Sequence, residues 1–289
     1  MTSGKTAGVI GEQLSIKKHD RDASAMKYVY PVLSRRAGGV SVGINLNVNN
    51  ACNWACVYCQ VPDLIRGGPP PVNMAELGKE LSSLLDEVLA GDFLAQRAPE
   101  TMRRLADIAF SGNGEPTSSA DFPQAVELVI AELTKRQLAG ILPIRVITNG
   151  SMVHRPRVQA ALARLGENGG EVWFKVDRAT EAGMREVNRT AASLAQVARH
   201  LVQAAGLAPV WLQTCWFALD GEAPSELEAS AYLEFVKANR NAIRGVHLYG
   251  IARPSMQPEQ ARLTRLSVSH LNALAARLNE IGVTATVSE

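Results

Sequence analysis

The sequence predicts an α/β protein in which parallel strands form a curved, barrel-like sheet with helices outside it. Strand patterns alternate with helical patterns along most of the chain, and this order is typical of parallel strands joined by crossover helices. Polar side chains recur on one face of the later strands, as expected for the concave side of a barrel. Three cysteines also gather directly after the first strand pattern, at the end where α/β folds place their active sites.

Six segments have strand character, and a helical pattern follows each of them. The first, residues 40–49 (VSVGINLNVN), alternates apolar with small or polar residues, which is the period of a strand. The other expected strands are 107–111, 144–148, 171–177, 210–217 and 245–251, with a short closing strand at 283–287. The expected helices lie near 73–88, 121–138, 156–166, 190–205, 224–239 and 267–281. Asn73 and Glu76 resemble the capping pair that begins a helix.

Strand alternation puts polar residues on one face of three strands: Lys175 with Asp177, Gln213 with Cys215, and His247 with Tyr249. If helices cover the apolar face, these side chains point to the concave side. Burying Lys175 and Asp177 without partners would be costly. We therefore expect a polar interior in which they meet ligands, or a direct pair between the two. His247 and Tyr249 are expected to contact substrate or to pack within the interior.

Length and composition indicate one domain. We assign residues 1–30 to an N-terminal arm and residues 31–289 to the barrel domain. The 46% hydrophobic content is ordinary for a globular protein, and the net charge of +2 permits a nucleic-acid partner without indicating one. Basic pairs such as Arg35-Arg36 are expected on the surface. The sequence lacks an apolar run of the ~18 residues that a membrane span needs and a secretory signal, so we expect a cytoplasmic protein.

Cys52, Cys56 and Cys59 have the spacing C-x3-C-x2-C. Thiolates select zinc or iron–sulfur clusters, and clustered cysteines do not indicate a disulfide framework. A structural zinc site needs four ligands, for which only His19 and the distant Cys215 are conceivable additions. Three thiolates can instead hold three irons of a four-iron cluster. The fourth iron is then open to a substrate or cofactor.

The segment CNWACVYC resembles the C-x3-C-x-aromatic-C signature of the radical S-adenosylmethionine enzymes, with Tyr58 as the aromatic residue. The resemblance covers roughly residues 32–256. It implies a partial (β/α)6 barrel of parallel strands with outer helices, open on one side. It further implies that Cys52, Cys56 and Cys59 ligate a 4Fe–4S cluster and that S-adenosylmethionine binds the open iron.

Within that superfamily the chain most resembles the wybutosine-synthase-like, tRNA tricycle-forming group and its bacterial relatives. The shared segments are GINLNVNNACNWACVYCQ, SGNGEPT, ITNGS and Arg253-Pro254. The tRNA enzyme carries a second iron–sulfur cluster whose ligands precede the signature motif. This sequence contains no cysteine before Cys52, which favours a single cluster and departs from that group.

The resemblance also assigns cofactor contacts. SGNGEPT is similar to the segment that receives the cofactor's amino group, and its glycines allow close backbone approach, although it could be only a tight turn. ITNGS is similar to the ribose-side segment, with an ordinary Asn-Gly turn as the alternative. Lys175 would meet the cofactor's carboxylate. The expected cofactor-binding residues are Tyr58, Gly112, Asn113, Gly114, Glu115, Thr148, Asn149, Ser151, Lys175, Asp177, Gln213 and Ile251.

The reaction implied by the resemblance begins with one electron from an external donor of the flavodoxin or ferredoxin type. Reductive cleavage of S-adenosylmethionine gives methionine and a 5′-deoxyadenosyl radical, which abstracts hydrogen from an unidentified small molecule or nucleoside. Cys215 is a candidate catalytic residue that donates a hydrogen atom or contacts substrate; the alternative is a small buried hydrophobe. The competing functions are an activating enzyme that generates a glycyl radical on a partner protein, a tRNA-modifying radical enzyme and a non-catalytic metal-binding module.

Overall fold

The computed structural model describes residues 13–15 and 26–288, so most of the predicted arm at residues 1–30 lies outside the described residues. One curved sheet has the strand order β1-β2-β5-β6-β7-β8-β10-β12. Its strands are β1 (Val29–Ser34), β2 (Gly39–Ile44), β5 (Leu105–Phe110), β6 (Ile144–Thr148), β7 (Glu171–Lys175), β8 (Val210–Cys215), β10 (Gly245–Tyr249) and β12 (Ala285–Ser288). All neighbouring pairs are parallel except β1–β2.

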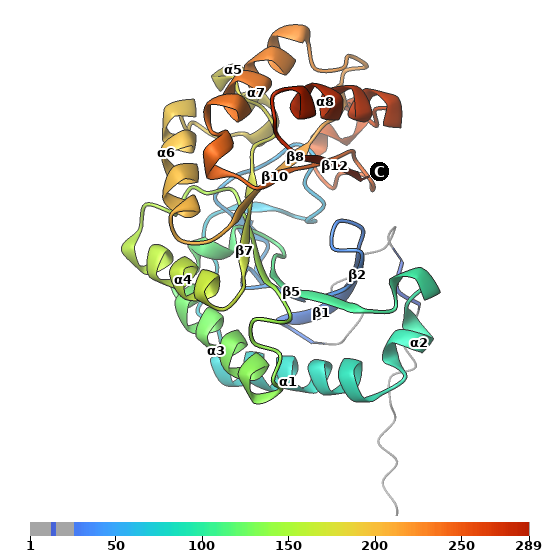
Figure 1. The fold of residues 1–289 in the computed structure, drawn as a ribbon, viewed down its shortest axis with the longest axis vertical. Helices are drawn as coiled ribbons and strands as arrows, with labels where there is room; N and C mark the ends of the chain where they lie inside the picture. Colours follow the sequence, from blue (N-terminus) through green and yellow to red (C-terminus); the bar gives the residue numbers. More distant parts are fainter. Residues whose placement is uncertain (1–12, 16–25, 289) are drawn as a thin grey trace, which may run out of the picture.

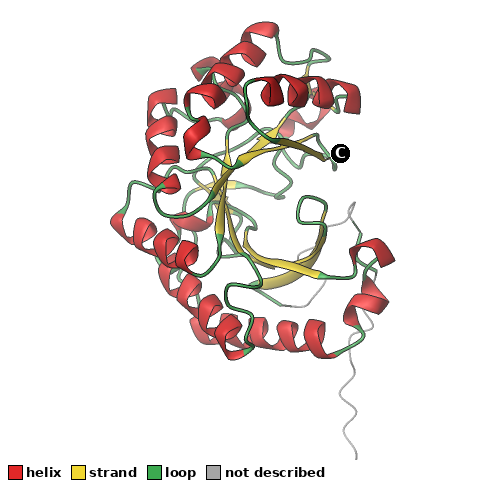
Figure 2. Ribbon diagram, in the orientation of Figure 1, coloured by secondary structure: helices red, strands yellow, loops and turns green. Residues whose placement is uncertain are grey.

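Helices form the outer layer of the molecule and the strands form the inner layer (Figures 1 and 2). They are α1 (Met74–Ala90), α2 (Phe93–Arg97), α3 (Phe122–Lys135), α4 (Pro156–Glu167), α5 (Glu181–Asn188), α6 (Leu194–Ala205), α7 (Glu226–Ala238) and α8 (Val268–Glu280). The two ends of the strand order, β1 and β12, are the edges of an open half-barrel. The predicted α/β partial barrel of parallel strands, open on one side, is therefore confirmed.

The core lies between the helices and the convex face of the sheet. Every second residue of β2 (Val40, Val42 and Ile44) packs there with the apolar face of α1. The opposite residues face the interior, where Ser41, Lys175 and Gln213 line a cavity. The predicted polar concave face is thus confirmed. In the described part of the chain no helix is both long and apolar enough to cross a membrane.

The structure corrects the first expected strand. β2 ends at Ile44 instead of Asn49, and β1 precedes it as an additional antiparallel edge strand. Pro31 concealed β1 in the sequence, since proline disrupts interior strands but is tolerated at an edge. After Ile44 asparagine side chains bond to the backbone: Asn45 Oδ1 accepts from the Asn47 N–H at 3.0 Å, and Asn47 Nδ2 donates to the Ala51 carbonyl at 2.8 Å. Such local bonds compete with strand pairing.

The helix expected near 190–205 begins at Leu194, and the separate helix α5 precedes it. Thr180 caps α5, because its hydroxyl oxygen accepts a hydrogen bond from the Gly183 N–H at 2.9 Å. Gly183 lies inside α5 and weakened the helical signal in the sequence. At α1 the Asn73 half of the predicted capping pair is confirmed: its side-chain oxygen accepts from the Glu76 N–H at 3.2 Å, whereas the Asn73 N–H donates to the Tyr28 hydroxyl at 3.1 Å and not to Glu76.

Candidate functional site

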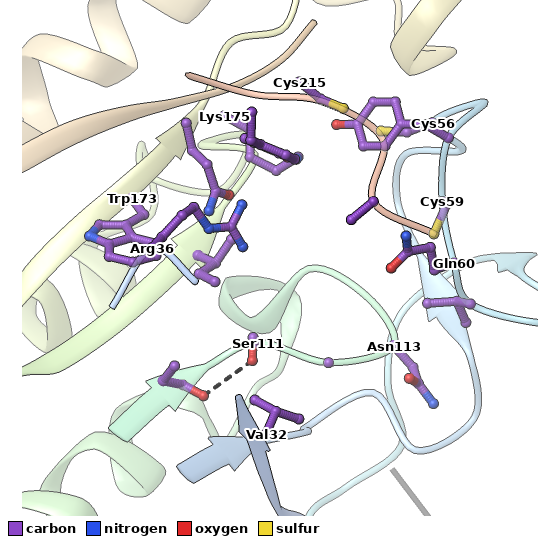
Figure 3. A pocket seen from close by; sticks show the side chains of 18 of the residues that line it. Val32, Arg36, Cys56, Cys59, Gln60, Ser111, Asn113, Trp173, Lys175 and Cys215 are labelled. Carbon is purple, nitrogen blue, oxygen red and sulfur yellow. Dashed lines mark hydrogen bonds between the residues drawn. The ribbon is translucent and has the colours of Figure 1, made fainter. Parts of the chain in front are cut away.

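A cavity of about 300 Å³ opens on the concave side of the half-barrel. It lies at the end of the sheet where the cysteine loop follows β2, and it extends along the interior past Lys175 to Trp173 (Figure 3). The lining includes most residues predicted from the sequence: Cys52, Cys56, Tyr58, Cys59, Gly112, Asn113, Gly114, Glu115, Asn149, Lys175, Gln213, Cys215 and Ile251. Thr148, Ser151 and Asp177 do not line it but contact residues that do.

The cysteine loop is held from several sides. A two-residue parallel pair, β3 (Ala51–Cys52) with β4 (Ile65–Arg66), closes its base. The Val57 N–H donates to the Val187 carbonyl at 2.9 Å, and the Ser255 hydroxyl donates to the Val57 carbonyl at 2.7 Å. These contacts come from segments more than a hundred residues later in the chain. The loop conformation therefore depends on the completed half-barrel.

The three loop cysteines are free thiols that are partly exposed to the cavity. Burial raises the pKa of the Cys52 thiol to about 11 and that of Cys56 to about 12. Bound metal reverses this preference, since coordination removes the thiol proton. Among the described residues no three His, Cys, Asp or Glu side chains are grouped closely enough to share one metal ion. In a four-iron cluster each cysteine binds a different iron, so ligation of a cluster does not require such a group.

The SGNGEPT segment forms part of the cavity wall, and its two glycines stand at positions where a side chain would not fit. Gly112 has φ +137°, and a Cβ there would lie 2.5 Å from Asn45 Oδ1. A Cβ on Gly114 would lie 2.1 Å from the Ala51 carbonyl oxygen, directly before Cys52. These glycines therefore allow the segment to pack against the cysteine loop while its backbone remains part of the cavity wall.

Glu115 is buried beneath this segment and is held by four donors. Its carboxylate accepts from the backbone N–H and hydroxyl of Thr117, from the Thr148 hydroxyl at 2.6 Å and from the Asn149 N–H at 2.7 Å. Burial raises the pKa of Glu115, whereas these donors lower it. The carboxylate thus joins SGNGEPT to ITNGS, which brings the two predicted cofactor segments together at the cavity wall.

ITNGS contacts the cysteine loop through asparagine side chains. Asn149 Nδ2 donates to Asn53 Oδ1 at 2.9 Å, and Asn53 Nδ2 donates to the Ser151 hydroxyl at 2.7 Å. Asn53 lies between two of the signature cysteines and was not singled out from the sequence. The motif around Asn53 is recognised by its cysteines, and nothing in the sequence indicates that Asn53 contacts ITNGS.

Lys175 and Asp177 do not pair as one sequence interpretation allowed, because each has its own partners. Lys175 Nζ donates to the Tyr249 hydroxyl at 3.2 Å and lies 5.0 Å from the centre of the Tyr58 ring. Burial lowers the pKa of Lys175, but neighbouring Tyr249, Asp177 and Cys56 raise it by more, which keeps the amine protonated. Asp177 accepts from Tyr58 and, at 2.7 Å, from Asn188 Nδ2.

Cys215 is 1% exposed, and its side chain packs with Val57, Val187 and Phe217 beside the cavity. Burial raises the pKa of this thiol well above its ordinary value. Cys215 is therefore a small buried residue, as one sequence interpretation expected, and its protonated thiol also lines the cavity; its role as a hydrogen-atom donor or substrate contact stays a prediction.

Arg36 was expected on the surface, and the structure corrects this. The β1–β2 turn directs its guanidinium into the cavity (Figure 3), where it lies 4.5 Å from the centre of the Tyr249 ring and 5.6 Å from that of Trp173. The basic pair Arg35-Arg36 carried no sequence signal for an inward position, since the strand before it was not recognised.

The cavity fits an added polar cofactor. Two buried polar atoms in its lining, Asn113 Oδ1 and Gln213 Nε2, have no hydrogen-bond partner among the described residues. Three free thiols face the same space, and the glycine-rich wall leaves backbone accessible. This donor set suits a thiolate-ligated cluster and a ligand that carries amino, carboxylate and hydroxyl groups.

Known proteins resemble this chain in sequence. The chain is 31% identical over 134 residues to a UPF0026 protein of Helicobacter pylori, covering 46% of this chain and 37% of that protein. It is 29% identical over 166 residues to a UPF0026 protein of Methanocaldococcus jannaschii, covering 55% of this chain and 43% of that protein. The chain thus spans less than half the length of these curated relatives.

Solved structures share the fold. A radical SAM methyltransferase from Sphaerobacter thermophilus superposes with a TM-score of 0.61 at 17% identity, over 90% of this chain and 68% of that one. TYW1 with a bound lysine-pyruvate adduct gives a TM-score of 0.56 at 12% identity, over 84% of this chain and 74% of that one. At these identities the likeness shows the architecture alone.

The family model of the Radical SAM superfamily matches residues 46–204, which is more than half of the chain and includes all three loop cysteines. Enzymes of this superfamily use a 4Fe–4S cluster and S-adenosylmethionine, and they need an electron donor. The match, the signature loop and the half-barrel agree, and we conclude that this chain belongs to the radical S-adenosylmethionine superfamily.

Proposed function

We propose that the protein is a radical S-adenosylmethionine enzyme that acts on a small molecule or nucleoside bound inside its half-barrel. The observation that carries this proposal is the shared cavity: three free thiols of one loop, the SGNGEPT wall and interior polar side chains all line it. When bound, the cluster and S-adenosylmethionine supply the electron transfer and the organic radical chemistry. The chain's residues bind, orient and enclose the reacting groups.

Cys52, Cys56 and Cys59 are the proposed ligands of a single 4Fe–4S cluster. Asn113 Oδ1, with no hydrogen-bond partner in the described part of the chain, is a free acceptor in the cavity wall for a cofactor amino or hydroxyl group. Glu115 acts by holding SGNGEPT against ITNGS, although one of its oxygens has a single donor and can accept another. Lys175 places a protonated amine in the cavity beside Tyr58, which suits a cofactor carboxylate.

Cys215 is the proposed hydrogen-atom donor to a substrate-derived radical. Its protonated thiol lies at the cavity wall beside the aromatic pair Tyr58 and Phe217, whose ring centres are 5.5 Å apart. Transfer would break the S–H bond and form a C–H bond on the product. The resulting thiyl radical would then take up one electron from the external donor and one proton from solvent.

Iron loading tests the ligand assignment. After anaerobic reconstitution with iron and sulfide, the parent protein should contain close to four irons per chain. Cys52→Ala, Cys56→Ala and Cys59→Ala should each lose most of this iron. Cys215→Ala is the matched control, because it removes a thiol outside the loop and should retain the cluster. Equal loss of iron in Cys215→Ala, or zinc in place of iron in the parent, would contradict the proposed cluster.

The class of substrate is tested with cell extracts that have been separated by size. With labelled S-adenosylmethionine, formation of labelled 5′-deoxyadenosine should depend on a low-molecular-mass fraction of the extract. A requirement for a protein fraction that acquires a glycyl radical, or for tRNA, would contradict a small-molecule substrate.

A further inference from the structure

More cationic than anionic side chains line the cavity as a whole. Four cationic side chains line the cavity, Arg35, Arg36, Lys175 and Arg253, against the two carboxylates Asp107 and Glu115. Both carboxylates are already engaged within the protein: Asp107 with Ser41 and Arg145, and Glu115 with its four donors. Neither carboxylate pairs with Arg36, whose contacts in the described structure are with aromatic rings.

The backbone of Arg36 is placed far from the cysteine loop. It lies in the β1–β2 turn, which is at the end of the sheet where the parallel strands begin, because Val40 is paired with Leu105 at the start of β5. The cysteine loop follows the other end of β2. Figure 3 shows Arg36 beside Trp173 and across the cavity from Cys59.

The guanidinium of Arg36 contacts ring faces, 4.5 Å from the Tyr249 centre and 5.6 Å from the Trp173 centre. Stacking of this kind fixes the plane of the guanidinium but does not use its N–H groups. These groups form the planar fork that binds carboxylate or phosphate through two parallel hydrogen bonds.

Gln213 provides a second donor in the lining of the same cavity. It is 1% exposed, and its Nε2 has no acceptor among the described residues. Strand register places Gln213 between Lys175 on β7 and His247 on β10. A buried donor without a partner destabilises the folded protein, and a ligand oxygen would relieve that cost.

We propose that Arg36 and Gln213 bind an anionic group of the substrate, a carboxylate or a phosphate, in the interior of the cavity beside Tyr249 and Trp173. The identification of this anion as part of the substrate rests on the proposed function; the anion site itself does not. Lys175, the expected contact of the cofactor carboxylate, is the neighbour of Gln213 on β7, so the experiment separates the two sites by saturating the protein with S-adenosylmethionine. The substrate is thus a small acidic molecule, anchored by its charged end.

Saturation-transfer NMR tests this directly, because it detects weak ligands through their methyl protons. The probes are acetate, methyl phosphate and the neutral acetamide, offered to reconstituted, unreduced protein with saturating S-adenosylmethionine. We expect binding of one or both anions and no binding of acetamide. Arg36→Met and Gln213→Leu should each weaken anion binding, Arg36→Met about tenfold or more. Arg199→Met, which removes the same charge from the exposed face of α6, should not change it.

Each outcome is decisive. Preference for acetate indicates a carboxylate substrate, and preference for methyl phosphate indicates a phosphorylated one. Absence of saturable binding, equal binding of acetamide, or loss of binding when S-adenosylmethionine is added would overturn the anion site. Unchanged binding in both Arg36→Met and Gln213→Leu, with iron content and thermal midpoint preserved, would also overturn it. Because the protein is not reduced, anion binding is measured without cofactor cleavage. Failure of the proposed reaction would be detected separately, by the assay for 5′-deoxyadenosine.

Discussion

The carboxylate of Asp177 accepts a hydrogen bond from the hydroxyl of Tyr58, 119 residues earlier in the chain. The same oxygen accepts from Asn188 Nδ2 at 2.7 Å, and the other oxygen accepts from the Cys215 backbone N–H at 2.8 Å. Asn188 Nδ2 also lies 3.3 Å from Cys56 Sγ. One buried carboxylate at the end of β7 thus connects the cysteine loop, α5 and β8.

Replacing this carboxylate should weaken both folding and cluster retention. Asp177→Ala leaves three donors without their acceptor, and we expect the free energy of unfolding to fall by about 3 kcal/mol. Tyr58→Phe removes one hydroxyl and should cost about 1 kcal/mol. Urea unfolding of the iron-free proteins measures the free energy of unfolding. Iron content after reconstitution measures how well the cysteine loop retains the cluster. Equal stability of parent and Asp177→Ala would contradict this role.

Gly114 controls the distance between SGNGEPT and the cysteine loop. In Gly114→Ala the new methyl group would lie 2.1 Å from the Ala51 carbonyl oxygen, so the loop must move away. We expect iron content after reconstitution to fall to less than half of the parent value. Gly68→Ala is the control, because a Cβ there meets nothing within 4 Å. If both alanine variants load iron like the parent, the packing of these segments does not position the cluster ligands.

Glu115→Gln should affect cofactor binding more than cluster binding. The amide keeps one acceptor oxygen but places an NH2 group against donors such as the Asn149 N–H, which separates SGNGEPT from ITNGS. We expect about tenfold weaker binding of S-adenosylmethionine, corresponding to loss of a charge-assisted hydrogen bond, with iron content unchanged. Equilibrium dialysis with labelled cofactor measures the first and iron analysis the second. Loss of iron without a change in cofactor affinity would show that Glu115 supports the cluster and not the cofactor.

His247 should make stability depend on pH. Its ring stacks on Trp211 at 4.5 Å and lies 4.7 Å from the Trp173 ring centre. Burial lowers the pKa of His247 to about 4; nearby Arg36 and Arg145 also lower it, and Glu171 opposes them. The unfolded chain, with a histidine pKa of about 6.5, binds a proton between pH 6.5 and 4 that the folded protein does not. The free energy of unfolding therefore falls as the pH drops through this window.

His247→Phe removes this contribution while keeping an aromatic ring. The loss of unfolding free energy between pH 7.5 and pH 5, measured by urea titration, should be smaller in His247→Phe than in the parent. Buried His200, whose pKa is also lowered, leaves part of the dependence in place. His270→Gln on the exposed side of α8 serves as the control and should retain the parent slope. An unchanged pH dependence in His247→Phe would contradict the neutral, buried state of this ring.

Much of the fold could be predicted from periodicity. β6 matches its expected limits, and α3, α4, α7 and α8 lie within a few residues of theirs, because each is amphipathic and has clear breaks at its ends. β1 could not be predicted, because Pro31 breaks its pattern and its pairing depends on a partner in space. The asparagines after Ile44 look like the polar face of a strand until their side-chain bonds to the backbone are known.

Part of the candidate site could likewise be predicted from the sequence, and part could not. The cysteine loop and SGNGEPT could be predicted because several residues at fixed spacing form recognisable motifs. Arg36, Asn53 and Asn188 could not, since each is a single polar residue whose role arises from contacts with distant segments. Asp177 was predicted as a cofactor contact, and its observed contacts are with Tyr58, Asn188 and Cys215; direct contact with the cofactor stays a prediction.

If the three loop cysteines make this protein a radical enzyme, it must cleave S-adenosylmethionine when it is reduced. The reconstituted protein is reduced anaerobically with dithionite, supplied with S-adenosylmethionine and analysed for 5′-deoxyadenosine by mass spectrometry. We predict formation of this nucleoside by the parent and by Cys215→Ala, and none by Cys56→Ala. A parent protein that holds four irons and binds S-adenosylmethionine, yet forms no 5′-deoxyadenosine with or without cell extract, would show that this protein is not a radical enzyme.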